Sequence, residues 1–211
     1  LPSILPNKPY ISMRVARNAD ITSSSELKEM IDKLEGKKIV LYQGNISKER
    51  PLDGYIDAIK ELGDEWVFMM MLNGENPYPD IKANNIIYVP FVAPPFHLEV
   101  TSHAYIGILS YVPVKNSHSI LNTLYCAPNK IWEYSKFGVP MISNDLPALR
   151  YVFETKGIGE CVLNMGGKGI KEKLLAIDSS YDKYSKQSAA FYDSFNYKNE
   201  IKKIIDKTVE T

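Results

Sequence analysis

The sequence has no excess of charge of either sign, few cysteines and no long apolar run. Its 211 residues include 25 Lys and Arg against 25 Asp and Glu, so the formal net charge is zero. This excludes a globally basic surface for nucleic acid or anionic membrane, although not a local basic patch. The longest apolar run, WVFMMML at 66–72, is far shorter than the roughly 20 residues of a membrane span. Two cysteines, Cys126 and Cys161, cannot define a disulfide framework, which favours a reducing cytoplasm.

Several motifs that would define a function are also missing. No G-x-G-x-x-G follows the first strand-like segment, which argues against an NAD-type dinucleotide site. The three histidines, His97, His103 and His118, lack H-E-x-x-H or a comparable metal-ligand spacing, so we expect solvated or core side chains. There is no serine or cysteine nucleophile motif. The chain begins with Leu1 rather than Met, and we expect it to be a piece of a longer protein.

What the sequence does contain is a regular alternation of short apolar runs and amphipathic segments. The apolar runs predict buried parallel strands, and the segments with apolar residues at helical spacing predict helices. The expected strands are 37–44, 66–72, 85–92, 105–111, 139–144 and 159–164, and the expected helices are 23–36, 51–63, 129–138 and 146–157, with two or three more in 169–209. This alternation implies right-handed crossovers and an α/β fold, a doubly wound Rossmann-like parallel sheet with helices on both faces.

The chain divides into three parts on this pattern. Residues 1–36 are expected to form a lead-in and a short helix, 37–165 the Rossmann-like core, and 166–211 C-terminal helices packed on that core. Ligands of such sheets bind beyond the carboxyl ends of the strands. The loops that follow the strands are therefore the places where binding residues are expected.

The loop after the first strand reads QGNISKERP and places Lys48 and Arg50 after Gly44. One glycine and two cations suit a phosphate that is held partly by side chains. The alternative is a solvated loop whose Lys and Arg face water. The loop by itself does not decide between these interpretations.

A second candidate is the segment CAPNKIWEYSKFGVPMISNDLP at 126–147. Pro128 fits the first turn of a helix, and the free amides of Asn129 and Lys130, together with the Lys130 charge, favour an anion. Glu133 lies about one turn deeper, where a carboxylate can accept two hydrogen bonds from a sugar diol. An ordinary helix with surface Lys and Glu explains these residues at least as well when they are considered alone.

The longer segment APNKIWEYSKFGVPMISNDLPALRYVFETKGIGECV resembles the donor-binding segment of retaining GT-B glycosyltransferases of the family-4 type, especially those of bacterial polysaccharide biosynthesis. Those enzymes typically read P-N-K-L-F-E-Y, then G-x-P-V-I, then Asp-x-Pro at a strand end. YQGNISKERPLDGYIDAIKEL is similar to their opening strand, glycine loop and helix, and SHAYIGILSYVP to the strand before the donor loop. The resemblance covers 38–211, the whole second domain of such an enzyme.

The resemblance implies the donor-binding half of an enzyme that moves a sugar from a UDP- or GDP-sugar to a glycan or lipid-linked acceptor on a missing N-terminal domain. Glu133 matches the glutamate that holds the nucleotide ribose, and Arg50 falls where the family has a phosphate-binding Lys, although Pro51 replaces its Gly. Arg50, Lys130 and Glu133 would carry this half's share of catalysis, which consists of positioning the donor and stabilising the leaving diphosphate. The other implied donor contacts are Gly44, Asn45, Lys48, Phe91, Val92, Tyr125, Ala127 and Asn129, with Phe91 and Val92 at the edge of the base.

From the cysteine count and the zero net charge we expect a cytoplasmic protein without a nucleic acid partner. The site is expected to require no cofactor and no bound metal, because cations and a helix terminus would stabilise the diphosphate. The resemblance leaves peripheral membrane association through the missing half open. Two departures stand out: Tyr125 occupies the place of the family's first Glu, which contacts the donor sugar, and Asn45 that of a frequent Arg. Tyr125 is the best argument for one alternative, a non-catalytic, donor-binding-like partner module. The other alternative is half of a nucleotide-sugar epimerase, which would need acid–base carboxylates and a histidine in the cleft, and the sequence shows no convincing set of these.

Two further segments have two interpretations each. Asn144 and Asp145 end a strand, where they face a ligand or cap the helix expected at 146–157. The Tyr- and Lys-rich segment 180–200 suits a single-stranded nucleic acid or a packed C-terminal helix pair. Zero net charge and the helical period favour the helix pair.

Overall fold

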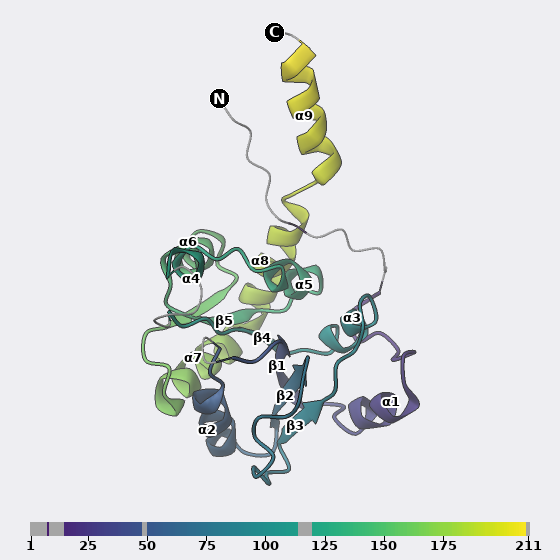
Figure 1. The fold of residues 1–211 in the computed structure, drawn as a ribbon, viewed down its shortest axis with the longest axis vertical. Coiled ribbons are helices and arrows are strands. Elements are labelled where there is room, and N and C mark those ends of the chain that lie inside the picture. The colour runs from purple at the N-terminus through teal and green to yellow at the C-terminus, as the bar shows by residue number, and fades with distance from the viewer. Residues whose placement is uncertain (1–7, 9–14, 48–49, 114–119, 210–211) are drawn as a thin grey trace.

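A computed structural model of the chain describes residues 8, 15–47, 50–113 and 120–209. Among these residues, six parallel strands form one sheet in the order β3-β2-β1-β4-β5-β6 (Figure 1). The strands are β1 (Lys38–Gly44), β2 (Trp66–Leu72), β3 (Ile86–Val89), β4 (Ile106–Leu109), β5 (Met141–Asn144) and β6 (Gly159–Val162). The predicted doubly wound, Rossmann-like sheet is confirmed.

Helices connect the strands and extend the chain beyond the sheet. They are α1 (Ser25–Asp32), α2 (Asp53–Leu62), α3 (His97–Thr101), α4 (Ile120–Leu124), α5 (Lys130–Lys136), α6 (Pro147–Lys156), α7 (Gly167–Ser179), α8 (Tyr181–Asp193) and α9 (Tyr197–Val209). All of the predicted helices are present, and the tail forms three. The five-residue helices α3 and α4 were not predicted, because such short segments show no helical period.

Alternate residues of the central strands point to opposite faces of the sheet, and both faces are covered. Leu41 and Met69 belong to the apolar cluster under α1, α3, α5 and α6. Val40, Tyr42 and Phe68 belong to the cluster under α2 and α7. A strand covered on both faces needs no polar positions, which explains the unbroken apolar run of β2.

The strand order reverses between β1 and β4. The chain adds β2 and then β3 on one side of β1 and crosses to the other side to add β4, β5 and β6. In doubly wound sheets the carboxyl ends of the two strands at such a reversal diverge and leave a crevice in which ligands bind. The end of β1 at Gly44 and the end of β4 at Leu109 border this position.

Helix α5 is held closely against β1 and β4. A Cβ at Gly107 on β4 would lie 2.5 Å from ring carbons of Tyr134, so this glycine allows the helix to approach. The Tyr134 hydroxyl donates a hydrogen bond to the Leu41 carbonyl at 2.9 Å. These contacts direct the first turn of α5 toward the end of β1.

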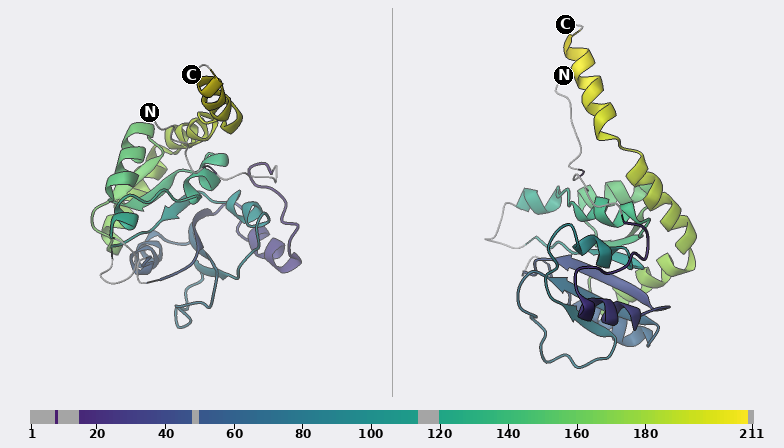
Figure 2. Two further views of the ribbon diagram at one scale, coloured as in Figure 1. Left: turned by 45° about the horizontal axis from the view of Figure 1, so that its top comes forward. Right: turned by 90° about the vertical axis from the view of Figure 1, so that its right-hand side faces the viewer.

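Helix α8 packs on α5, and α9 does not continue this packing. Trp132 stacks on Phe191 with ring centroids 4.5 Å apart, and Ser188 donates to the Val139 carbonyl at 2.8 Å. These contacts support the packed-helix interpretation of this part of 180–200. Helix α9 extends away from the body of the domain in all views (Figures 1 and 2).

Within the described ranges, no helix combines the length and the apolar character that crossing a membrane requires.

Candidate functional site

The candidate site lies at the carboxyl end of β1, beside the strand-order reversal. Gly44 ends this strand with a φ of +118°, a conformation that L side chains rarely adopt. A Cβ at Gly44 would also lie 3.2 Å from both Cε and Nζ of Lys130. The glycine therefore allows the Lys130 side chain from α5 to lie against the end of β1, and two predicted site residues are brought together.

The Lys130 ammonium group is buried without a hydrogen-bond partner among the described residues. The nitrogen lies 4.5 Å from the ring centroid of Tyr42 and 5.7 Å from that of Tyr111, although the residue as a whole is only half-buried. Burial, and to a smaller extent the positive charge of Arg50, lower the pKa of Lys130, and Glu133 opposes the shift; the resulting pKa is about 7. A lysine in such surroundings favours an anion that would restore its charge.

Arg50 supplies a second cation to this site. Its Nε is buried and has no hydrogen-bond partner in the described part of the chain, and its Nη1 donates to the Asn45 carbonyl at 3.3 Å. The guanidinium carbon lies 5.3 Å from the ring centroid of Tyr111. Arg50 and Lys130 thus approach the same ring with donor atoms unused, and buried donors of this kind are costly unless a ligand accepts from them.

The loop after β1 is fixed by hydrogen bonds to its backbone. The buried Tyr42 hydroxyl donates to the Asn45 carbonyl at 2.5 Å, and burial raises the pKa of Tyr42 to about 12. Ser110, directly after β4, donates to the Pro51 carbonyl at 2.9 Å. This hydrogen bond joins the segment after β4 to the loop after β1, at the residue that directly follows Arg50. Lys48, the other predicted cation, lies outside the described residues.

Glu133 is not a freely solvated residue of α5. Its side chain is 18% exposed, and its Oε1 lies 3.5 Å from Nε2 of His97 on α3. Its Oε2 accepts a hydrogen bond from Gln43 Nε2 at 2.5 Å, across 90 residues of sequence. Gln43 in turn accepts from the buried Thr101 hydroxyl at 2.7 Å. His97 is partly buried, and its ring faces a candidate site carboxylate, a contact that the spacing of the histidines did not indicate.

The remaining predicted donor contacts are more exposed. Phe91 is 57% exposed and Tyr125 is 65% exposed, whereas Val92 packs against the apolar core. Ala127 and Asn129 are exposed residues that lead into α5. Their contacts with a donor stay predictions. Because α5 has only seven residues, we base the hypothesis of an anion site on the side chains of Arg50 and Lys130 and not on the helix terminus.

The predicted capping roles of Asn144 and Asp145 are wrong. Helix α6 has Leu146 at its N-cap and no side-chain cap. Asp145 instead accepts two hydrogen bonds from Arg150, with Nη2 and Oδ2 2.5 Å apart. The Asn144 amide exchanges hydrogen bonds with the backbone of Tyr111. Asn144 thereby holds the segment after β4 that carries the Tyr111 ring to the two cations.

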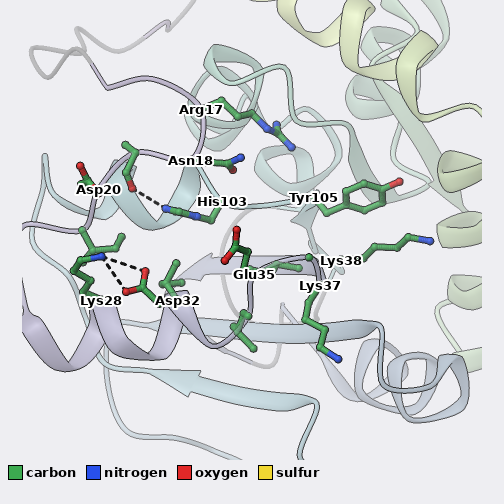
Figure 3. Close-up of a pocket in the computed structure, with 16 residues that line it drawn as sticks. Arg17, Asn18, Asp20, Lys28, Asp32, Glu35, Lys37, Lys38, His103 and Tyr105 are labelled. Carbon is green, nitrogen blue, oxygen red and sulfur yellow. Dashed lines mark hydrogen bonds and ion pairs between the residues drawn. The ribbon is translucent and has the colours of Figure 1, made fainter.

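A cavity of about 580 Å³ lies elsewhere, at the amino end of β1 (Figure 3). Several of its polar side chains already have partners within the protein. Arg17 donates to the Phe137 carbonyl at 2.8 Å and to the Tyr181 hydroxyl at 2.7 Å. His103 Nε2 lies 2.7 Å from the Ala19 carbonyl oxygen. This cavity lies at the end of the sheet opposite to the crevice in which ligands of doubly wound sheets bind, so we do not select it as the site.

The part of the chain that the structure describes contains no group of three or more His, Cys, Asp or Glu side chains that could hold a metal ion.

Comparison with solved structures defines the class of fold. HepE of Anabaena in complex with UDP-glucose matches with a TM-score of 0.65 at 11% identity, over 89% of this chain and 52% of that chain. The C-terminal domain of LpcC, a group 1 glycosyl transferase of Francisella tularensis, matches with a TM-score of 0.54 at 14% identity, over 85% of this chain and 95% of that domain. The pneumococcal O-GlcNAc transferase GtfA in complex with UDP and GlcNAc matches with a TM-score of 0.59 at 16% identity, over 93% of this chain and 38% of that chain.

The architecture is therefore the C-terminal, Rossmann-like half of a GT-B fold, as the sequence resemblance implied. The chain spans about half the length of HepE. Its sequence matches no protein-family model and shows no significant similarity to a curated protein.

Three site residues escaped the sequence analysis. Gln43 had a signal, since it is the one polar side chain between Lys38 and Gly44 in an otherwise apolar run. His97 and Thr101 had none, because the short helix α3 that carries them was itself not predicted.

Proposed function

We propose that this chain is the donor-binding half of a glycosyltransferase. It binds a nucleoside diphosphate sugar, and the sugar passes to a glycan or lipid-linked acceptor held by another domain. The observation that carries the proposal is the pair Arg50 and Lys130, whose buried donors Nε and Nζ lack hydrogen-bond partners in the described residues. This pair lies beside Glu133 at the carboxyl end of β1, where a GT-B half would place its donor.

The chemistry of such a transfer suits this arrangement. As the bond between the sugar and the diphosphate breaks, negative charge develops on the leaving diphosphate. Arg50 and Lys130 stabilise that charge, and a water-poor site makes each contact stronger than it would be in solution. In this proposal the two side chains perform the neutralisation, and no metal or other cofactor takes part.

Glu133 binds the ribose of the same donor. An ionised carboxylate only accepts hydrogen bonds, and the two adjacent hydroxyls of a ribose can both donate to it. The complexes of HepE and GtfA contain UDP, which supports a UDP-sugar as the first donor to test, with a GDP-sugar as the other. Retention of configuration and a role in polysaccharide biosynthesis belong to the same proposal and rest on the sequence resemblance.

The contact between His97 and Glu133 favours a second candidate, a nucleotide-sugar epimerase. Epimerisation needs an acid–base pair near the sugar, and a histidine 3.5 Å from a carboxylate is such a pair. An epimerase converts its nucleotide sugar into a stereoisomer without an acceptor, whereas a transferase does not. Incubating the chain with UDP-sugars and following the sugar protons by NMR separates the two.

The test of the proposed function is calorimetric titration of the chain with UDP, GDP and ADP, with and without attached glucose. One nucleotide is expected to bind, and Glu133→Ala is expected to weaken it by about 1.5–3 kcal/mol, the range for hydrogen bonds to a charged group. Glu29→Ala is the matched control, because Glu29 is also a helical glutamate but is 70% exposed on α1.

A glycosyltransferase donor half would retain the affinity in the control and lose it in the Glu133 variant. Binding of none of the three nucleotides at millimolar concentration, or equal binding by both variants, would contradict the proposal. Turnover of a UDP-sugar with an acceptor by this chain alone would contradict the part that assigns the acceptor to another domain.

A further inference from the structure

A buried polar chain connects Glu133 to two segments that are distant in sequence. Thr101 on α3 is fully buried, and Gln43 near the end of β1 is 4% exposed. The Thr101 hydroxyl lies 2.7 Å from Gln43 Oε1, and Gln43 Nε2 lies 2.5 Å from Glu133 Oε2. Both contacts lie next to the apolar cluster that includes Leu41 and Leu98.

The orientation of the Gln43 amide follows from Glu133. An ionised carboxylate has no hydrogen to donate, so Gln43 must turn its NH₂ toward Glu133. Its carbonyl oxygen then faces Thr101, whose hydroxyl must donate to it. The Thr101 hydroxyl also lies 2.9 Å from the His97 carbonyl oxygen, and it keeps that acceptor when Gln43 is absent. The Gln43 amide therefore has one consistent orientation, with its NH₂ toward the carboxylate and its oxygen toward Thr101.

We propose that Gln43, oriented by Thr101, is a positioning residue that holds the Glu133 carboxylate in the plane required by a ribose diol. The inference rests on the proposed function. With one lone pair of Oε2 engaged by Gln43, each carboxylate oxygen still has a lone pair for one ribose hydroxyl. His97 Nε2 is 3.5 Å from Oε1, which is too long for a strong hydrogen bond and leaves that oxygen available.

A purely structural tie between β1, α3 and α5 is the competing explanation. Buried polar networks cost desolvation free energy, and apolar side chains of the same shape often replace them without loss of stability. A structural tie would affect all ligands of the site alike. A positioning residue affects only those ligands that carry the hydroxyls Glu133 binds, and this difference makes the proposal testable.

The experiment measures the affinity of the chain for UDP, GDP and ADP and for their 2′,3′-dideoxy counterparts by calorimetry. The wild-type chain is expected to prefer the ribonucleotide to its dideoxy form by about tenfold or more. Gln43→Leu is expected to reduce this preference by about fivefold while the affinity for the dideoxy nucleotide stays unchanged. Thr101→Val is expected to act in the same direction and more weakly, because the Gln43 amide remains.

Two further variants complete the design. Gln187→Leu is the matched control, since it makes the same substitution at a buried amide oxygen that packs against Gly157, away from the site. It is expected to leave the preference intact. Gln43→Leu combined with Glu133→Ala is expected to show no larger loss of preference than Glu133→Ala alone, because Gln43 acts through that carboxylate.

The outcomes separate the inference from the function it rests on. A wild-type chain that binds no nucleotide, or that binds ribose and dideoxyribose forms equally, overturns the assignment of Glu133 and the inference with it. A wild-type preference that persists fully in Gln43→Leu overturns the inference and leaves the proposed function standing. An equal loss of affinity for both nucleotide forms in Gln43→Leu also overturns it, because a general structural effect would produce that result.

Discussion

Nucleotide binding by this chain should take up protons through Lys130. The free protein holds this lysine with a pKa lowered to about 7, because its ammonium nitrogen is buried and because Arg50 repels it. The groups that face it are the carboxylate of Glu133, which opposes the shift, and the rings of Tyr42 and Tyr111. A diphosphate bound between the two cations adds negative charge and returns the pKa of Lys130 toward its ordinary value of 10.5.

The magnitude follows from the two pKa values. With a pKa of about 7, Lys130 in the free protein is about 50% protonated at pH 7 and about 10% at pH 8. In the complex it is almost fully protonated at both. Binding should therefore take up about 0.5 proton at pH 7 and about 0.9 proton at pH 8, and the affinity should fall about fivefold over that interval.

Calorimetric titration with UDP or GDP in HEPES and in Tris, whose ionisation enthalpies differ, measures the uptake directly. Lys130→Met removes the titrating group and should remove this part of the uptake, whereas Lys136→Met, on the same helix α5, should not. The phosphate of the nucleotide titrates equally with every variant, so the difference between variants isolates the lysine. Equal uptake by the wild-type chain and Lys130→Met at pH 8 would refute the reasoning.

Two predictions concern stability. Lys130→Met should stabilise the fold at pH 6 by at most about 5 kcal/mol. This gain should decline as the pH rises from about 7 toward 10.5. In that interval Lys130 is protonated in the unfolded chain and neutral in the folded protein, so a rise in pH stabilises the wild-type fold. Urea unfolding at several pH values measures the gain, and a pH-independent difference would contradict it. Gly107→Ala should destabilise the fold by about 1–3 kcal/mol, because its Cβ would lie 2.5 Å from the Tyr134 ring; unchanged urea unfolding would show that α5 shifts without cost.

The order and type of the longer elements could be predicted because each has a local cause. The run WVFMMML reads as a strand since β2 is covered on both faces, and helix α6 ends where Gly157 adopts the left-handed conformation with a φ of 63°. Helices α3 and α4 could not be predicted in this way. Each has five residues, and tertiary contacts rather than a sequence period maintain segments of that length.

The candidate site was likewise predictable from the sequence only in part. Arg50, Lys130 and Glu133 stand in local patterns that the sequence displays, a glycine loop after a strand and a Pro-Asn-Lys at the start of a helix. The sequence does not show that the side chains of these residues are buried. The same residues on an exposed loop and an exposed helix would have been ordinary solvated charges, and the sequence allowed both interpretations.

By itself, the sequence determined the α/β class, the strand-helix alternation and the segments that carry the charges, because hydrophobic period and turn residues act over a few positions. Only the tertiary structure decided that the Lys130 side chain is buried against Gly44. It also decided that Gln43 and Thr101, which are 58 residues apart, form a chain of hydrogen bonds that ends on Glu133. Desolvation and hydrogen-bond geometry depend on which distant segments pack together, and no local pattern encodes that packing.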